Sequence, residues 1–377
     1  MKRVRKLSTS ALTAFLECPE RYRLAYVEGI RPAEDAAVLR VGSSWHGIRE
    51  AISDADDQHD RLDAAMAYLD ERYGVVPNHI SPEAWAVERE SLAVAAVAYD
   101  WHYRDDDQIE HIAAELPYEL PLHDPATGQP VMNGDVRNGV IDNLVRLADG
   151  RVAVREYKTT SRDIDPAADY WKRLKWDQQI STYLVSAQQM QRQGLLLPYG
   201  IRPSDPLIDT VVYDVMRKPT IRPKYLTQAE TKRFRGSGEY CGRVCDLDPE
   251  AGTIDGYAYE VKAGKGGEAI KETPTMYGAR LLEAICADPR KYFARREIAR
   301  TAGQLRDYQV TLWKAYQTIV YMDENDLWVR NMNSCETPFK CQYTAICYYD
   351  QPTTNGQTPQ GFKRIFSVTV NGAEVAA

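Results

Sequence analysis

The stretch that most constrains the fold is residues 134–161, where two strand-like segments flank a tight turn. Residues 140–147 and 151–158 are both rich in apolar and β-branched side chains. Asp149-Gly150 separates them, and glycine adopts at little cost the positive φ that a short hairpin turn requires. The sequence therefore predicts a β-hairpin here.

Three charged side chains give this hairpin a candidate chemistry. Asp142 lies in the first segment, and Glu156 and Lys158 lie in the second. Side chains alternate along a strand, so Glu156 and Lys158 point to the same face. Two carboxylates across a hairpin with an amine beside them suit a hard cation such as Mg²⁺ or Mn²⁺. A surface hairpin with a solvated Glu–Lys pair would show the same sequence pattern. The choice between the two interpretations therefore depends on the rest of the chain.

The order of these residues resembles the motif of the PD-(D/E)XK nucleases, with Asp142 first and Glu156-Tyr157-Lys158 as the E-x-K. The resemblance implies an α/β fold with a restriction-endonuclease-like core, in which helices flank a mixed central sheet. It implies metal-assisted hydrolysis of a phosphodiester, with Asp142, Glu156 and the Tyr157 carbonyl as metal ligands. Lys158 would then orient the attacking water or stabilise the phosphate oxygens.

Residues 7–26 predict two consecutive helices, with Pro19 in the first turn of the second and Cys18 at the joint. A lone cysteine is most simply a small buried hydrophobe. However, the pattern S-x-S-x-L-x-x-F-x-x-C-P-x-x-Y-x-L-x-Y around Cys18 is similar to the N-terminal signature of RecB-family nucleases that carry an iron–sulfur cluster.

Two further metal ligands follow from the resemblance. His46 lies on a predicted helix, off its apolar stripe, and a histidine on an early helix of such nucleases helps bind the catalytic metal. A neutral imidazole is an acceptable ligand beside carboxylates. Glu115, in a proline-interrupted segment that predicts an edge strand, occupies the position where the family often has a carboxylate near the metal. Glu119 is an alternative, and either residue could be structural.

Gln179 and Tyr183 lie four residues apart on a predicted helix over 171–193, so they share a face. Such a pair can simply pack beside the core. It also resembles the Q-x-x-x-Y motif that follows the E-x-K strand in the same nucleases, which implies that both residues line the catalytic site. Gln178 is the neighbour that a shift of one residue would select instead.

Three late cysteines, Cys335, Cys341 and Cys347, are spaced C-x5-C-x5-C. Close cysteines in a chain that shows no secretory signal indicate soft-metal binding. The sequence offers several candidates for a fourth ligand, namely Cys18, Cys241, Cys245 and Cys286.

The family resemblance selects Cys18 as that fourth ligand. In the iron–sulfur relatives, which include AddB-type helicase-nucleases and CRISPR-associated exonucleases, one early and three late cysteines hold a [4Fe–4S] cluster. The cluster would join the two ends of the chain around the nuclease core. Four thiolates also suit a structural Zn²⁺, which stays as the alternative.

The chain is acidic, with a net charge of −7, yet residues 217–235 contain seven lysines and arginines. Arg222, Lys224 and Arg233 are the candidate DNA contacts of this basic segment, and Tyr225 and Phe234 are interleaved for stacking on unpaired bases. A solvated loop is the alternative interpretation of the segment.

At 377 residues the chain can bury a sizeable core. Neither a run of transmembrane length nor the apolar core of a signal peptide is evident, so a cytoplasmic protein of a bacterium or a phage-infected cell is expected. We predict five units: N-terminal helices with Cys18 and His46 (1–53), a helical lobe (54–111), the nuclease core (112–216), a basic loop or insertion (217–275), and C-terminal helices with the cysteines (276–377).

These features together predict a metal-dependent DNA exonuclease that acts on single-stranded DNA or DNA ends in recombination, replication or repair. The expected cofactors are Mg²⁺ or Mn²⁺ and the [4Fe–4S] cluster, and the expected partners are DNA and a recombination or integration protein. One alternative is a catalytically silent DNA-binding assembly subunit, against which the intact acidic motif argues. The other is a nuclease that processes DNA ends for CRISPR adaptation.

Overall fold

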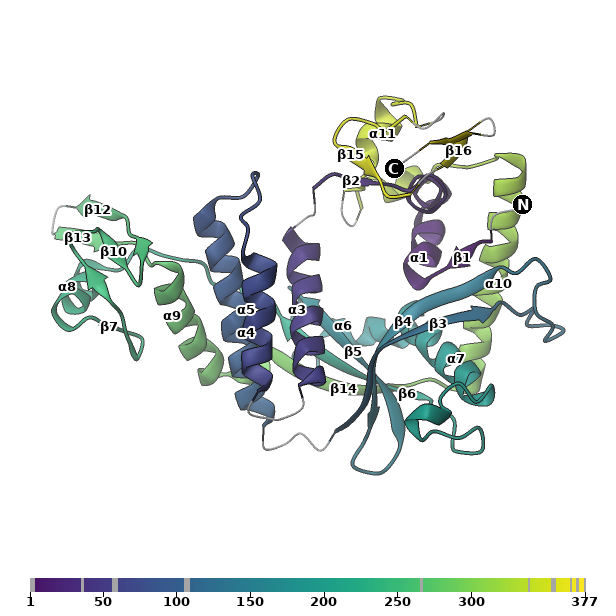
Figure 1. Cartoon of the computed structure of the whole chain (residues 1–377), viewed down its shortest axis with the longest axis horizontal. Coiled ribbons are helices and arrows are strands. Elements are labelled where there is room, and N and C mark those ends of the chain that lie inside the picture. The colour runs from purple at the N-terminus through teal and green to yellow at the C-terminus, as the bar shows by residue number, and fades with distance from the viewer. Residues whose placement is uncertain are drawn as a thin grey trace.

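The computed structural model of the chain describes residues 4–34, 37–55, 60–104, 109–264, 267–337, 340–353, 357–366, 368–370 and 373–375. A six-stranded mixed sheet lies at its centre in the order β1–β4–β5–β6–β14, and β3 pairs with β4 (Figure 1). The strands of this sheet are β1 (Lys6–Leu7), β3 (Glu110–Pro121), β4 (Val136–Arg146), β5 (Val152–Thr160), β6 (Thr210–Arg217) and β14 (Phe293–Ala299). This is the mixed central sheet that the sequence predicted.

Helices cover both faces of the sheet, as Figure 1 shows. One face packs on α1 (Thr9–Glu17), α7 (Gln178–Arg192) and α10 (Ala302–Asn325), which share one apolar core with the strands. The other face packs on α3 (Ala37–Asp54), and α4 (Arg61–Tyr73), α5 (Pro82–Tyr103) and α9 (Pro274–Ala287) complete a second core. The sheet is therefore the middle layer of three. Short helices connect these elements: α6 (Asp169–Arg173) and the 3-10 turns η2 (Leu174–Trp176), η3 (Leu197–Tyr199) and η4 (Pro289–Lys291).

Strand β4 has two different edges. Along one edge it pairs with β3 from Val136 to Arg146. Along the other it pairs in parallel with β1 at Val136 and Arg137, and antiparallel with β5 only from Asn143 onward. The hairpin predicted from Asp149-Gly150 is confirmed, and Gly150 has a φ of 85°. The part of β4 between its two partners therefore opens the sheet locally.

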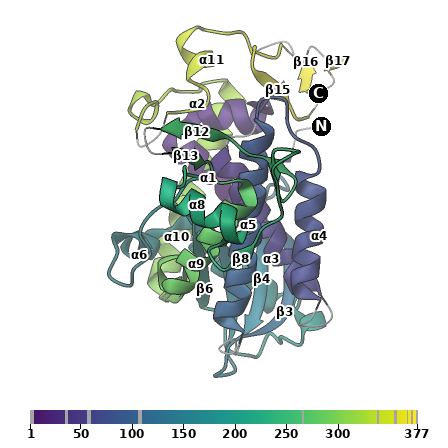
Figure 2. The ribbon, with the colours of Figure 1, turned by 90° about the vertical axis from the view of Figure 1, so that its left-hand side faces the viewer.

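The segment at 217–275, predicted to be a basic loop or insertion, forms a small unit of its own after β6, at one end of the molecule (Figures 1 and 2). Leu226, Phe234, Ile254 and Ile270 are buried in its core, and this apolar burial is the physical reason that the segment is ordered. It contains α8 (Gln228–Ser237) and the short strands β7 (Glu239–Tyr240), β8 (Arg243–Val244), β9 (Leu247–Asp248), β10 (Thr253–Ile254), β11 (Tyr257–Ala258), β12 (Val261–Gly264) and β13 (Gly267–Ile270).

The unit predicted at 276–377 was expected to be helical before its cysteines, but it contains a strand between α9 and α10. Strand β14 pairs antiparallel with β6 from Phe293↔Met216 to Ala299↔Thr210. The free edge of β6 supplies hydrogen-bond partners that no local pattern reveals. The predicted lobe at 54–111 forms α4 and α5, and its residues 56–59 and 105–108 lie outside the described ranges.

The two ends of the chain meet in one place, seen at the top of Figure 1. Strand β2 pairs antiparallel with β15, and the aromatic ring of Tyr343 stacks on Phe362 beneath them. The elements of this region are α2 (Pro19–Tyr22), the π-helical turn η1 (Arg23–Val27), β2 (Ile30–Pro32), η5 (Met332–Ser334), α11 (Thr344–Tyr348), β15 (Phe362–Arg364), β16 (Val368–Val370) and β17 (Ala373–Val375). Among the helices of the described ranges, none combines the length and the apolar character needed to cross a bilayer.

Candidate active site

Asp142 and Glu156 face each other at the point where β4 and β5 separate. The backbone ladder between these strands ends at Asn143↔Arg155, so the next pair in register, Asp142 and Glu156, lies just beyond it. Beyond the end of the ladder, the Asp142 side chain replaces a backbone partner, because its Oδ2 accepts a hydrogen bond of 3.1 Å from the Tyr157 N–H. Two carboxylates thus meet where the sheet opens.

Glu156 is fully buried, and its two oxygens have different surroundings. Oε1 accepts hydrogen bonds from Lys158 Nζ and, over 2.9 Å, from Gln179 Nε2. Oε2 has no hydrogen-bond partner among the described residues. A buried carboxylate oxygen normally has a partner, so Oε2 is available to a group that the chain itself does not provide.

Helix α7 holds Gln179 at this site. Asp177 caps the helix by accepting from the Gln179 N–H at 2.7 Å, which fixes Gln179 in the first turn. The Gln179 side chain accepts from Lys158 Nζ at 2.8 Å and donates to Tyr183 Oη at 2.8 Å. Gln179, rather than its neighbour Gln178, therefore joins the E-x-K residues to Tyr183.

His46 approaches from the opposite side, on α3. Its Nδ1 lies 3.3 Å from Asp142 Oδ2, and its ring meets the Tyr157 ring edge-on. Helix α3 packs against β5, and a Cβ at Gly42 would lie 3.4 Å from Thr159 Oγ1, which is an ordinary van der Waals distance. Burial lowers the pKa of His46, so its imidazole is neutral near pH 7 and can offer a lone pair to a metal.

The two carboxylates and the lysine influence one another strongly. Burial and the neighbouring Glu156 charge raise the pKa of Asp142 well above its ordinary value. Burial alone would lower the pKa of Lys158, but the charge of Glu156 and its hydrogen bond outweigh this effect and raise it. Lys158 therefore stays charged, whereas ionised Asp142 needs further positive charge to be stable.

Glu115 lies nearer to the site than Glu119. It sits in β3 between residues that pair with Asn143 and Ile141, with an unusual positive φ of 44°. Burial raises the pKa of Glu115, and the charges of Glu50, Glu156 and Asp54 raise it further. Glu119 forms an exposed ion pair with Lys6 instead.

Sequence reasoning missed the carboxylates of Glu50 and Asp54 near Glu115. Both follow His46 on α3 at steps of four residues, so all three share one face of the helix. That spacing was the signal that could have identified them. Together with Glu115 they extend the negative charge of the site toward the outer part of β3.

The side chains of Asp142, Glu156 and His46 fit a divalent metal ion chemically, although they do not form a complete coordination site in this arrangement. Within the described ranges, no group of three or more His, Cys, Asp and Glu residues is arranged so that it could already hold a metal. Nevertheless, Glu156 Oε2 is buried and unpaired, Asp142 resists ionisation, and His46 is neutral. Oxygen and imidazole ligands of this kind suit Mg²⁺ or Mn²⁺.

The structure brings Cys18 to the late cysteines. Cys18 Sγ accepts from the Asn331 N–H at 3.3 Å, and the Cys341 N–H donates to the Cys335 carbonyl at 2.7 Å. Burial raises the pKa of Cys347 to about 11, and Cys18 and Cys341 are near enough to raise it too. These cysteines are free thiols.

The other three cysteines lie elsewhere in the fold. Cys241 and Cys245 belong to the small unit at residues 217–275, and Cys286 is exposed on α9. Figure 1 separates both regions from α11. The fold therefore offers Cys18 alone, of the four candidates, as a companion for Cys335, Cys341 and Cys347 among the described residues.

Arg222, Lys224 and Arg233 are exposed on the small unit. Lys224 lies 3.5 Å from Glu230, so part of its charge is offset locally. The aromatic residues of this basic segment differ from each other. Tyr225 is 41% exposed and donates to Glu260, whereas Phe234 is buried in the core of the unit. The prediction that Phe234 stacks on bases is therefore wrong.

Comparisons with known proteins find relatives of this chain. A subunit of the ATP-dependent helicase/deoxyribonuclease of Streptococcus equi subsp. zooepidemicus is 28% identical in strain H70 over 258 residues, and 29% identical in strain MGCS10565 over 255 residues. Each alignment covers 62% of this chain and 22% of the relative, so the chain spans about a fifth of their length. The solved structure described as "Crystal structure of SSO0001" shares 13% identity over 58% of this chain and 65% of that one, with a TM-score of 0.20.

A family model has the widest coverage. The model described as "PD-(D/E)XK nuclease superfamily" matches residues 6–348, which include the hairpin, His46, α7 and all the cysteines. The chain therefore belongs to the PD-(D/E)XK nuclease superfamily.

Proposed function

We propose that this protein is a metal-dependent DNA exonuclease that acts on single-stranded DNA or on DNA ends in recombination or repair. The observation that carries the proposal is the unpaired, buried Glu156 Oε2 facing Asp142 beside Lys158. A structural Glu–Lys pair normally has hydrogen-bond partners for both buried carboxylate oxygens. A catalytic pair needs that oxygen for a cation.

Asp142, Glu156 and His46, with the Tyr157 carbonyl and Glu115 as a further carboxylate, would hold Mg²⁺ or Mn²⁺. Bound there, the cation would acidify an attacking water and offset the charge that develops on the phosphate. The raised pKa of Asp142 supports this assignment, because a nearby cation would favour its ionised form.

Lys158 has the role of a positioned cation. Its ammonium is held by Glu156 Oε1 and by Gln179 Oε1, at 2.8 Å from the latter, so its direction is fixed before DNA binds. A preorganised ammonium stabilises the developing charge on phosphate oxygens without reorganisation during the reaction. Tyr183 in turn fixes the Gln179 amide, because that amide donates to Tyr183 Oη.

The four cysteines would hold a structural [4Fe–4S] cluster, with Zn²⁺ as the alternative. Cys18 and the late cysteines belong to segments that are also joined by backbone contacts, such as the Glu20 N–H donating to the Val329 carbonyl at 3.0 Å. A metal centre there would add its binding free energy to the folding of both chain ends. Iron and zinc analysis of anaerobically purified protein distinguishes the two. Undiminished metal content in Cys18→Ser would overturn the assignment.

The names of the relatives in Streptococcus support a DNA substrate and a helicase as partner. Arg222, Lys224 and Arg233 would contact DNA backbone on the small unit. Neutralising all three should then weaken DNA binding and flatten its salt dependence. Unchanged affinity and salt slope would remove these residues from the interface.

The test of the function is digestion of linear single-stranded DNA, linear duplex and a closed circle, each labelled, with Mg²⁺ or Mn²⁺. We expect loss of the linear substrates that needs both an end and the metal, and that Glu156→Gln abolishes. The exposed Glu297→Gln variant of β14 serves as the matched control. Cleavage of the closed circle would show that the protein is an endonuclease and would overturn the proposed exonuclease activity. DNA binding without any cleavage would support a silent assembly subunit.

A further inference from the structure

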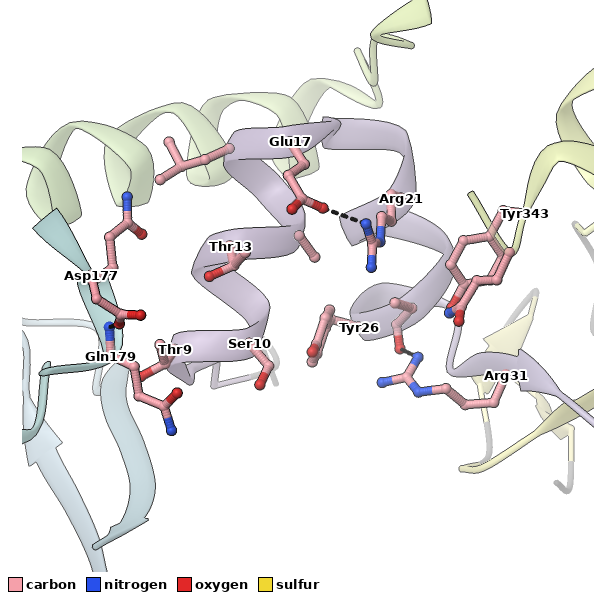
Figure 3. Close-up of a pocket in the computed structure, with 15 residues that line it drawn as sticks. Thr9, Ser10, Thr13, Glu17, Arg21, Tyr26, Arg31, Asp177, Gln179 and Tyr343 are labelled. Atoms are coloured by element: carbon pink, nitrogen blue, oxygen red, sulfur yellow. Dashed lines mark hydrogen bonds and ion pairs between the residues drawn. The ribbon is translucent and has the colours of Figure 1, made fainter. Parts of the chain in front are cut away.

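A polar pocket of about 630 Å³ adjoins the catalytic residues (Figure 3). Its lining comes from three separate parts of the chain: α1 and the segment through β2, the beginning of α7, and the segment between Cys341 and Cys347. Gln179 belongs to this lining, and the same side chain bonds to Lys158 and Glu156. The pocket therefore begins at the catalytic site and extends toward the cysteines.

The chemistry of the pocket matches a nucleic-acid strand. Thr9, Ser10 and Thr13 line it from α1 and lie between Gln179 on one side and the Arg31 end of the pocket on the other (Figure 3). Hydroxyl, amide and guanidinium groups are the donors with which proteins hold phosphates and sugars. Arg21 is the second guanidinium in the lining.

An aromatic surface lies at the far end of the pocket. The Arg31 guanidinium lies 4.9 Å from the centre of the Tyr26 ring, and Tyr26 itself stacks on Tyr22 with ring centres 5.5 Å apart. The Tyr26 ring is thus already in contact with Arg31 and Tyr22, and the Arg31 guanidinium is the planar group that the pocket can offer to an unpaired base. The pocket combines hydroxyl and amide groups near the catalytic site with this planar guanidinium farther away.

The size of the pocket suits a short single strand. Its volume lies within the range of about 300–1,000 Å³ that is typical of small-ligand sites. A few nucleotides of one strand can enter such a space. Glu17 and Asp177 also line the pocket, so its charge is mixed and its selectivity depends on shape and hydrogen bonds more than on net charge.

We propose that this pocket binds the single-stranded DNA segment next to the phosphate that is cleaved, and so selects unpaired strands for the catalytic site. The inference rests on the proposed function and extends it from the reaction to the form of the substrate. It also gives the cysteine region a role in binding. Tyr343 forms part of the wall, and its hydroxyl donates to the Ile30 carbonyl at 2.8 Å.

The test fills the pocket by Thr13→Trp, because Thr13 is exposed on α1 and points into it. The matched control is Thr311→Trp, the same change at an exposed position of α10 outside the pocket. We expect Thr13→Trp to raise KM for single-stranded oligonucleotides at least tenfold, while Thr311→Trp leaves KM unchanged. Equal KM values for both variants and the wild-type enzyme would overturn the pocket proposal and leave the nuclease proposal intact.

A second pair of variants tests the phosphate contact. Arg21→Gln breaks an exposed i,i+4 pair with Glu17, and the control Arg104→Gln breaks an exposed i,i+4 pair with Asp100. Fluorescence anisotropy with labelled oligo(dT) and Glu156→Gln protein measures affinity without cleavage. Arg21→Gln should reduce the slope of log K against log salt by about 0.7, the value for one contact to a single strand. An unchanged slope would remove Arg21 from the strand.

The binding measurement also separates the two proposals. If the wild-type protein cleaves no DNA, the nuclease proposal fails, and oligo(dT) affinity then decides the pocket alone. In that case, a lower affinity of Thr13→Trp for oligo(dT) would support the pocket proposal. An unchanged affinity would overturn it. If Thr13→Trp lost as much affinity for a blunt duplex as for oligo(dT), the pocket would not select single strands.

Discussion

The two sides of β5 carry two buried polar clusters with opposite properties. On the α7 side, Glu156 leaves one oxygen without a partner among the described residues, and the pKa of Asp142 is raised. On the α5 side, Asp214 accepts from Arg155 Nε at 2.9 Å and Arg295 Nε at 3.1 Å, and also from the Tyr99 hydroxyl. Within the part of the chain that the structure describes, the α5 cluster satisfies its carboxylate and the α7 cluster does not.

The pKa values express the same contrast. Burial alone would raise the pKa of Asp214, but the charges of Arg155, Arg295 and Arg49 outweigh it and lower the value to about 2. Burial raises the pKa of Asp142, and Lys158 does not offset it. A fully paired buried carboxylate contributes to stability, whereas an under-compensated one indicates a place for a ligand.

The largest expected effect is on stability, from the α5 cluster. Asp214→Asn leaves buried guanidinium groups without their carboxylate, so the free energy of unfolding should fall by about 3–5 kcal/mol. Denaturant unfolding followed by circular dichroism measures this change. Asp149→Asn, which alters an exposed carboxylate that is also paired with arginine, is the control and should unfold like wild type. If Asp214→Asn lost only a little unfolding free energy, the α5 cluster would not have the structural role assigned to it.

The α7 cluster should show the reverse result. Asp142→Asn should reduce DNA cleavage by about 100- to 1,000-fold, the range for removal of one group that stabilises the transition state. Its melting temperature in metal-free buffer at pH 7 should stay equal or rise, because the folded protein disfavours the ionised carboxylate. Steady-state cleavage and calorimetry on one preparation test both parts. A clear drop in melting temperature would place Asp142 with the structural residues.

The two carboxylates should also differ in the direction of their pH dependence. The folded-state pKa of Asp214 is depressed, so its stabilising contribution is complete above the ordinary value of 3.8 and is lost as the pH falls through about 2. The folded-state pKa of Asp142 is raised, so the wild-type protein should lose stability relative to Asp142→Asn as the pH rises above 3.8. Unfolding curves of the variants between pH 2 and pH 8 measure both trends, and parallel trends would contradict the contrast.

A smaller effect is expected from residues that only position the catalytic groups. Gln179→Ala removes the acceptor of Lys158 and should reduce cleavage by about 10- to 100-fold, as expected for a residue behind the first ligands. Tyr183→Phe removes one hydrogen bond of about 0.5–1.5 kcal/mol and should reduce cleavage less than Gln179→Ala does. Gln193→Ala, at an exposed position at the C-terminal end of α7, is the control. If it lowered activity as much as Gln179→Ala, the role of Gln179 would be wrong.

The hairpin that carries the candidate site could be predicted because its signals are local. Alternation along β5 puts Glu156 and Lys158 on one face whatever the rest of the chain does. The same holds for Gln179 and Tyr183, four residues apart on α7. Strand β14 could not be predicted in this way, because its segment forms a strand only where the edge of β6 is available.

What the sequence by itself determined is the set of candidate site residues and their faces on each strand and helix, since periodicity is a property of the local backbone. Only the tertiary structure decided which faces meet. It brought His46 to Asp142, left Glu156 Oε2 without a partner among the described residues, and placed Cys18 near the late cysteines. These contacts join segments far apart in the chain, and their free energy depends on the packing of the whole fold rather than on any single stretch.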